Sequence, residues 1–108
     1  MELRSRTINL VTVLDLSGRF DAHTASIVVA ALEKAAPTPP AKIVVNLGGV
    51  SFMDSTALAA LVQGMKRCRQ AGGDLRLCNL QQPVRIIFEL TRLDKAFDIY
   101  ASEAEALA

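Results

Sequence analysis

The sequence is poor in several residue types on which enzymes and nucleic-acid-binding proteins rely. It has no tryptophan, one tyrosine, four phenylalanines, one histidine and two cysteines among 108 residues. Its 12 lysines and arginines nearly balance its 11 aspartates and glutamates, which leaves a net charge of +1. This balance provides no basic surface for nucleic acid or for an anionic membrane. Cys68 and Cys78 are too few and too far apart for a metal site, so we expect two free, buried thiols.

The sequence also lacks a long hydrophobic run. No stretch approaches the roughly 18 to 20 apolar residues that a transmembrane helix needs. The charged start, Met1 to Arg6, leads into no apolar block of the signal-peptide type. We therefore expect a cytoplasmic protein without membrane insertion. The chain is 51% hydrophobic and long enough for a core of its own, so we expect one domain over residues 1–108.

The first 20 residues have β character. Residues 10–17 are rich in β-branched side chains, and Gly18 is expected to end this strand. The more polar residues 4–7 predict an edge strand. A turn near Ile8 and Asn9 would pair the two strands in a hairpin.

Helical spacing follows from Thr24 to Ala35, with Thr24 as the expected N-cap. The proline run over residues 36–40 should stop this helix, because proline lacks the backbone donor. Residues 42–47 are almost continuously apolar, which predicts a central strand buried on both faces. Gly48 and Gly49 are expected to close it.

The second half of the chain repeats this alternation. It predicts a helix over residues 54–71 that stops at Gly72-Gly73, a strand over 74–80, a helix begun by Pro83, a strand over 96–100, and a helix over 103–107 capped by Ser102. The order is therefore β-β-α-β-α-β-α-β-α. It predicts an α/β domain with a mixed β-sheet, in which an opening hairpin precedes the alternation and helices pack on the sheet.

One candidate functional position lies between a buried strand and the longest helix. Asp54 and Ser55 occupy it, and either side chain could simply cap the free N–H groups of the helix. Alternatively, the Ser55 hydroxyl is exposed at the carboxyl end of the strand, where α/β folds usually keep their sites. A phosphate there would add about −1.5 to −2 charges. The helix N-terminus would tolerate it. Spacing alone leaves both interpretations open.

The loop that contains Asp21, His23 and Thr24 is a second candidate. A hydrolase could be assembled from His23, Asp21 and Ser55 if Ser55 lay within hydrogen-bond reach of His23. However, no Gly-x-Ser-x-Gly elbow surrounds Ser55, and Gly48-Gly49 lacks the lysine of a phosphate-binding loop. We therefore expect no enzymatic activity.

Several blocks of sequence, in order and with consistent spacing, resemble the anti-sigma factor antagonist family, small proteins of one STAS domain. The blocks are residues 16–25 (LSGRFDAHTA), 43–47 (IVVNL), 50–55 (VSFMDS), 72–78 (GGDLRLC) and Pro83-Val84. The resemblance runs from the opening hairpin to the last helix. It implies a STAS-like mixed sheet and a protein-binding switch.

In that family the serine after the Asp of the Asp-Ser motif is phosphorylated by a partner that is both an anti-sigma factor and a serine kinase. The resemblance implies that this residue is Ser55 and that Asp54 helps to position it. The unphosphorylated form would bind the anti-sigma factor and free a sigma factor, the phosphorylated form would release it, and a phosphatase would reset the switch. The loop of Asp21 and His23 would lie near Ser55, and the chain would need no cofactor. The expected partner-binding residues are Asp21, His23, Thr24, Met53, Asp54, Ser55, Thr56 and Ala57.

Two residues depart from the family pattern. Members commonly continue Asp-Ser with serine and glycine, whereas Thr56 and Ala57 follow here. Thr56 is therefore an alternative phosphate acceptor, and the Ala57 methyl group could obstruct a close approach by the partner. The alternative function is a STAS scaffold or regulatory subunit of a signalling assembly or lipid-transport complex, without a phosphorylation cycle. The absence of a heptad or a large apolar surface favours a monomer.

Overall fold

The computed structural model describes residues 1–35 and 39–108. Along the chain the elements are β1 (Glu2–Ile8), β2 (Val11–Phe20), α1 (Ala25–Ala35), β3 (Lys42–Met53), α2 (Ser55–Gln70), β4 (Asp74–Cys78), α3 (Gln82–Leu90), the short 3₁₀ helix η1 (Leu93–Lys95), β5 (Asp98–Tyr100) and α4 (Glu103–Leu107). The predicted order is confirmed, with η1 as an addition. Part of the predicted proline stop, residues 36–38, lies outside the described residues.

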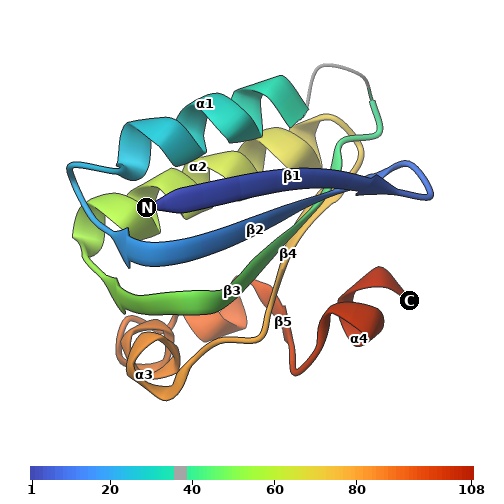
Figure 1. Ribbon diagram of the computed structural model, residues 1–108. Helices are drawn as coiled ribbons and strands as arrows, with labels where there is room; N and C mark the ends of the chain where they lie inside the picture. The colour runs from blue at the N-terminus through green and yellow to red at the C-terminus, as the bar shows by residue number, and fades with distance from the viewer. Residues whose placement is uncertain (36–38) are drawn as a thin grey trace.

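The strands form one sheet in the order β1-β2-β3-β4-β5 (Figure 1). β1 runs antiparallel to β2, and the other neighbouring strands are parallel. Asn9 and Leu10 connect the hairpin, with φ angles of 48° and 69°. Two successive positive φ angles are typical of tight turns that match the twist of antiparallel strands. The predicted α/β fold with a mixed sheet is confirmed.

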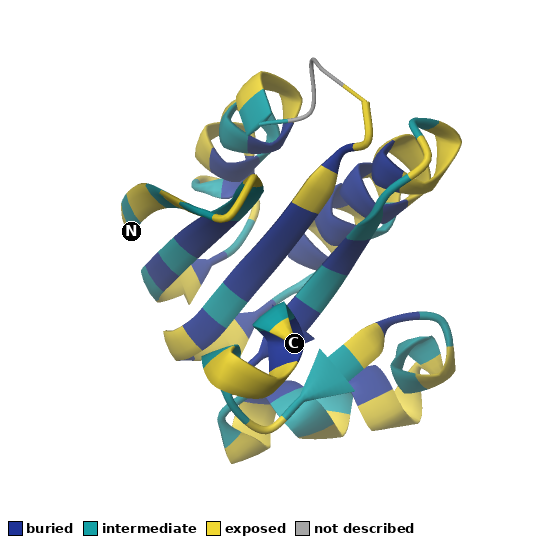
Figure 2. Cartoon of the chain, turned by 90° about the vertical axis from the view of Figure 1, so that its right-hand side faces the viewer, coloured by how far each residue is buried: buried dark blue, intermediate teal, exposed yellow. Residues whose placement is uncertain are grey.

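Helices α1 and α2 lie side by side over one face of the sheet (Figure 1). Alternate strand residues point to this face, since side chains change sides at every step along a strand. Leu14 and Ile43 of the sheet, Val28 of α1 and Leu61 of α2 are all at most 1% exposed. Figure 2 shows buried residues along the central strands and on the inner sides of the helices. Aliphatic packing thus fixes both helices on the sheet.

The opposite face of the sheet is partly covered by α4. A second apolar cluster lies there, formed by Val13, Val44, Cys78 and Ala106. The Arg6 guanidinium donates to Asp15 with an Nε–Oδ2 distance of 2.7 Å, and it also donates to Glu103 at the start of α4. This ion pair network ties α4 to β1 and β2. Cys68 and Cys78 are free and buried, as predicted.

Strands β2 and β3 are longer than predicted, because β2 continues past Gly18 and β3 continues past Gly49. The register between these strands shifts between Asp15 and Ser17, as it does at a β-bulge. A Cβ added to Gly49 would lie 2.5 Å from the Cβ of Ser17. Gly49 therefore permits a close approach of the two strands instead of ending one of them.

Helices α2 and α4 follow the predicted end signals closely. Helix α2 begins at Ser55, and Gly72 after its last turn has the expected left-handed conformation, with φ of +78°. The Ser102 hydroxyl accepts from the backbone N–H of Glu105 and so caps α4 as predicted. Strand β4 ends at Cys78, two residues before the prediction, because Asn79 turns the chain with φ of 60°.

Candidate functional site

The carboxyl ends of β2 and β3 lie side by side, so two connections leave the sheet at one place. Phe20 of β2 is paired with Met53 of β3, and both side chains are buried, at 0% and 2% exposure. Residues 21–24 form the turn into α1, and Asp54 leads into α2. The two sequence segments singled out as candidates are therefore neighbours in space.

Asp54 connects these two segments through its carboxylate. Oδ1 accepts from the backbone N–H of Ala57 at 3.0 Å and thereby caps α2. Oδ2 accepts from the backbone N–H of Ala22 at 3.0 Å, in the β2–α1 turn. The Asp54 backbone N–H also donates to the carbonyl of Phe20 at 3.3 Å. One residue thus fixes the start of α2 and holds the neighbouring turn against it.

The β2–α1 turn is ordered by Asp21. Its Oδ1 accepts from the His23 backbone N–H at 3.0 Å, and its own backbone N–H donates to Thr24 Oγ1 at 2.9 Å. These bonds close the turn that precedes α1. Thr24, the predicted N-cap, does directly precede the first helical residue, Ala25. Its hydroxyl, however, accepts from the Asp21 backbone N–H and donates to the Arg19 carbonyl, so it bonds within the turn and not to the helix. The His23 side chain is exposed.

The Asp21 carboxylate is held in its charged form. Partial desolvation alone would raise the pKa of Asp21, but the hydrogen bonds from the His23 backbone N–H and the Arg19 guanidinium outweigh that effect. The pKa therefore lies below its ordinary value. The Asp21 carboxylate therefore stays ionised to lower pH than an ordinary aspartate.

Ser55 and Thr56 are the first two residues of α2, and both are exposed. The first N–H groups of a helix have no acceptor within the helix, and the helix dipole makes this end favourable for negative charge. A phosphate on either hydroxyl would be solvent-accessible and close to these donors.

Met53 and Ala57, in contrast, are core residues. Their side chains are 2% and 0% exposed. The surface around Ser55 therefore presents hydroxyl groups. Met53 and Ala57 face the core, because they lie on either side of the point where β3 meets α2. The Ala57 methyl group, which was expected to face a partner, fills core space instead.

The hydrolase interpretation finds no support in the hydrogen bonds of this edge. Within residues 1–35 and 39–108, none of them joins Ser55 to His23. In the same ranges, no three His, Cys, Asp or Glu side chains are placed to hold a metal ion. No helix in the described part of the chain is long and apolar enough to cross a bilayer.

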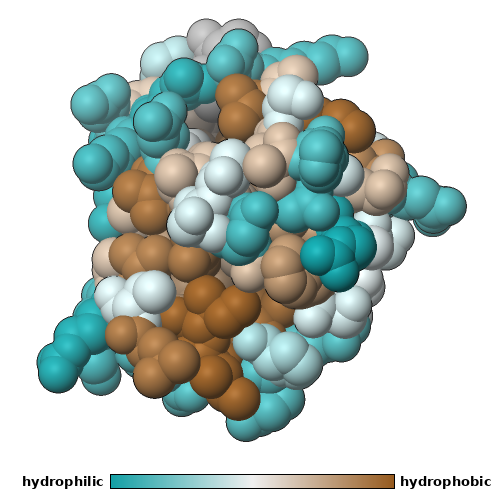
Figure 3. Space-filling view, turned by 90° about the vertical axis from the view of Figure 1, so that its left-hand side faces the viewer, coloured by the Kyte–Doolittle hydropathy of each residue, from teal (hydrophilic) through white to brown (hydrophobic). Residues whose placement is uncertain are grey.

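The same edge holds a pair of side chains that the motifs did not single out. Arg19 and Phe52 are paired in register across β2 and β3, and the Arg19 Cζ lies 3.9 Å from the centroid of the Phe52 ring. The sequence could have indicated this pair only by position. Arg19 and Phe52 each stand one residue before the buried last residue of a strand, and alternate residues of a strand point to opposite faces. Figure 3 views the molecule from the side of these loops and shows apolar side chains gathered among polar ones.

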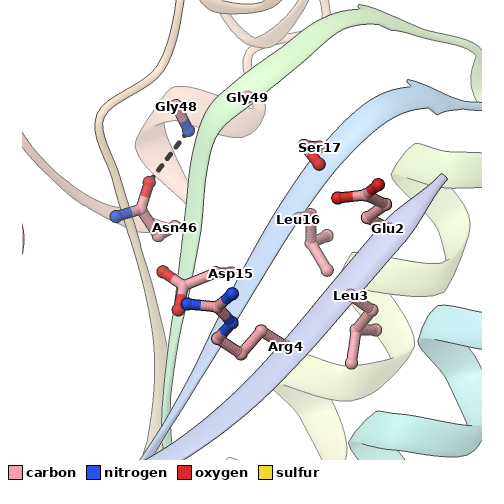
Figure 4. A pocket seen from close by; sticks show the side chains of 9 residues that line it. All are labelled: Glu2, Leu3, Arg4, Asp15, Leu16, Ser17, Asn46, Gly48 and Gly49. Carbon is pink, nitrogen blue, oxygen red and sulfur yellow. Dashed lines mark hydrogen bonds between the residues drawn. The ribbon is translucent and has the colours of Figure 1, made fainter.

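A broad groove of about 660 Å³ lies elsewhere, on the sheet face opposite α1 and α2. Polar side chains of β1, β2 and β3 line it, among them Arg4, Asp15 and Asn46 (Figure 4). The Asn46 Oδ1 accepts from the Gly48 backbone N–H at 2.9 Å, which supports the bulged part of β3. None of the predicted site residues lines this groove.

Comparison with known proteins agrees with the fold described above. The model of the STAS domain family matches residues 2–106. The anti-sigma F factor antagonist of Paenibacillus polymyxa is 32% identical over 98 residues, which cover 90% of this chain and 84% of that protein. The crystal structure of an anti-sigma factor antagonist from Mycobacterium paratuberculosis aligns with a TM-score of 0.87 at 27% identity, over 98% of this chain and 90% of that one.

The anti-sigma factor antagonist SpoIIAA aligns in two states. Its unphosphorylated form has a TM-score of 0.82 at 25% identity, over 98% of this chain and 93% of that one. The phosphorylated form, from Bacillus, has a TM-score of 0.74 at 24% identity, over 98% and 96% of the two chains. From the family match, the sequence identity and the shared fold, the chain belongs to the STAS domain family, among the anti-sigma factor antagonists.

Proposed function

We propose that this chain, as one STAS domain, antagonises an anti-sigma factor that is also a serine kinase. The unphosphorylated form binds this partner and frees a sigma factor in the cytoplasm. Phosphorylation of Ser55 releases the partner, and a protein phosphatase restores the binding form. The chain acts by binding and needs no cofactor, because the kinase brings nucleotide and metal.

The observation that carries this proposal is the placement of Ser55. It is exposed at the first turn of α2, directly after Asp54, whose carboxylate holds the Asp21–Thr24 turn beside it. A kinase can reach such a hydroxyl without unfolding the domain. The names of the relatives support the antagonist role, and the phosphorylated form of SpoIIAA supports a phosphate on this fold.

A phosphate at this position is well suited to switch binding off. It adds about −1.5 to −2 charges to a surface that the partner must cover. Asp54 already places a carboxylate next to it. An unpaired charge that is buried at an interface costs several kcal/mol. Since about 1.4 kcal/mol changes an affinity tenfold, one phosphate is sufficient for release.

Thr56 is the alternative acceptor, because its hydroxyl is exposed one residue further along α2. The test is to incubate the chain with the kinase-type anti-sigma factor from the same organism and ATP, and to map the phosphate by mass spectrometry. We expect label on Ser55, its loss in Ser55→Ala and its retention in Thr56→Ala. The reverse pattern would assign the acceptor to Thr56. Binding without any phosphate on either residue would contradict the cycle and favour the scaffold role.

A further inference from the structure

We propose that Arg19 and Phe52 form the anchor through which the partner protein docks beside Ser55, with the Arg19 guanidinium donating to a carboxylate of the partner. This inference rests on the proposed function and adds to it the contact that holds the partner. It assigns a role to two residues outside the Asp-Ser motif.

The first support is that the guanidinium is held in place before any partner arrives. It lies over the Phe52 ring at 3.9 Å, and its Nε is 3.4 Å from Oδ2 of Asp21. Cation–π contacts and planar donors make arginine well suited to carboxylate recognition. A side chain that is already ordered loses less conformational entropy when it binds.

The second support is exposure. The Arg19 side chain is 64% exposed, and Phe52 is 37% exposed. Arginine and aromatic residues are enriched among the residues that dominate binding energy at protein interfaces. A large aromatic ring left at the surface, stacked under an arginine, matches this composition.

The third support is that the nearby carboxylates are already hydrogen-bonded within the domain. The Asp21 carboxylate accepts from the backbone N–H of His23 in its own turn. The Asp54 carboxylate accepts from the backbone N–H groups of Ala22 in that turn and of Ala57 in α2. Their charges are therefore engaged within the domain. The contact between Arg19 and Asp21 is long and uses Nε, so the guanidinium can still donate to a carboxylate from outside. The complementary group on the partner is accordingly acidic.

The fourth support is proximity to Ser55. Phe52 precedes Ser55 by three residues, so their Cα atoms are at most about 11 Å apart. An interface of ordinary size covers about 800 Å² on each partner, a patch with a radius of about 16 Å. A partner centred on Ser55 therefore also covers Phe52 and the Arg19 stacked on it.

The test measures binding of the unphosphorylated full chain to the purified anti-sigma factor by titration calorimetry. We expect Arg19→Glu to weaken binding at least about tenfold, and Arg19→Lys to weaken it less, because lysine keeps the charge and loses the planar fork. Lys42→Glu is the matched control. It makes the same charge change at the exposed first residue of β3, at the opposite end of that strand from Phe52. It should change binding less than twofold.

Two further measurements separate docking from folding. Each variant is checked by thermal unfolding, and Phe52→Tyr, which keeps the ring, should bind nearly as tightly as the wild type while Phe52→Ala does not. Arg19→Gln should reduce the dependence of the affinity on salt. An acidic residue of the partner changed to lysine should restore binding to Arg19→Glu, which would identify the carboxylate.

The outcomes separate the two proposals. If the wild type binds, phosphorylation abolishes binding, and folded Arg19→Glu binds within twofold of the wild type, the anchor is overturned and the proposed function stands. If the unphosphorylated wild type does not bind the anti-sigma factor, both proposals are overturned. Failure of every acidic substitution on the partner to restore binding would overturn the carboxylate contact.

Discussion

Asp54 and Ala22 are joined by a hydrogen bond of 3.0 Å between residues 32 positions apart in the sequence. The acceptor is the carboxylate that also caps α2 through Ala57. The start of α2 and the β2–α1 turn therefore share one anion. Any substitution at residue 54 acts on both, and the two effects can be separated experimentally.

Asp54→Asn and Asp54→Ala should differ in a defined way. Asparagine has one carbonyl oxygen, so it can cap α2 but cannot also accept from Ala22. Alanine loses both bonds and should cost about 1 to 2 kcal/mol of unfolding free energy in urea titrations. Amide hydrogen exchange at Ala22 should accelerate in both variants. Unchanged protection at Ala22 in Asp54→Ala would show that the tether does not order the turn.

Ser55→Asp and Ser55→Ala test the switch without a kinase. Aspartate adds negative charge at the exposed start of α2 and should weaken binding to the anti-sigma factor by at least about tenfold. Alanine adds no charge and should leave the affinity near that of the wild type. Thr56→Asp shows whether a negative charge one residue further along α2 weakens binding as much as one at residue 55. Equal binding by Ser55→Asp and Ser55→Ala would contradict a switch based on charge.

Ala57→Gly should affect stability and leave partner binding unchanged. The Ala57 side chain is fully buried, so its removal loses core contacts, and glycine is a poorer helix former by about 1 kcal/mol. We expect a loss of about 1 to 2 kcal/mol in chemical denaturation. The Kd for the anti-sigma factor should remain within twofold. A large change in Kd with little change in stability would mean that the methyl group faces the partner.

Gly49→Ala should be strongly destabilising. The added Cβ would lie 2.5 Å from the Ser17 Cβ and 2.9 Å from the Leu16 carbonyl oxygen, so the two strands would have to move apart. Overpacking of this kind costs about 1 to 3 kcal/mol. Gly48→Ala is the neighbouring control, since its Cβ would meet the Asn46 side-chain oxygen at 3.1 Å, and a side chain can move. Thermal unfolding should place Gly49→Ala well below Gly48→Ala.

Cys78 should make the protein less stable in alkali. Burial raises the pKa of the Cys78 thiol to about 11, from an ordinary value of about 9. Between these values the unfolded chain releases the proton and the folded chain keeps it. The unfolding free energy should therefore fall from about pH 9 towards pH 11, by up to about 1.4 kcal/mol per pH unit from this group.

The control for this alkaline effect is Cys78→Ala, in which the contribution of the thiol should disappear. Subtracting the two pH profiles removes the contributions of lysine and tyrosine titration. Identical profiles would show that the thiolate is as well solvated in the folded chain as in the unfolded chain. Alkylation of native protein at pH 8 should correspondingly be slow, because the thiol is protonated and buried.

The order of elements could be predicted because each element carries its own local signal. The 3.6-residue spacing of apolar positions marked the helices, and Ser102 and Gly72 marked helix ends. The errors arose where a residue's role depends on a distant neighbour. Gly49 looks like a strand terminator until Ser17 is known to lie against it.

The candidate site likewise has features that local sequence predicts and features that depend on distant residues. Ser55 was found from its place between strand and helix, and its pairing with the Asp21 loop came from the family resemblance. The bond between Asp54 and Ala22 has no signature in sequence spacing, because it depends on the parallel register of β2 and β3. That register also decides which side chains at the ends of β2 and β3 are exposed to solvent. Met53 therefore belongs to the core and Phe52 to the surface.

The buried pair of Phe20 and Met53 has a consequence for the evolution of parallel signalling pathways. The β2–α1 turn and the β3–α2 junction leave the sheet just beyond this pair. One layer of buried side chains therefore separates the exposed residues around Ser55 from the core. Exposed positions outside that layer can change at little cost in stability. Under the proposed function, duplicated genes can therefore diverge in partner choice while keeping one scaffold.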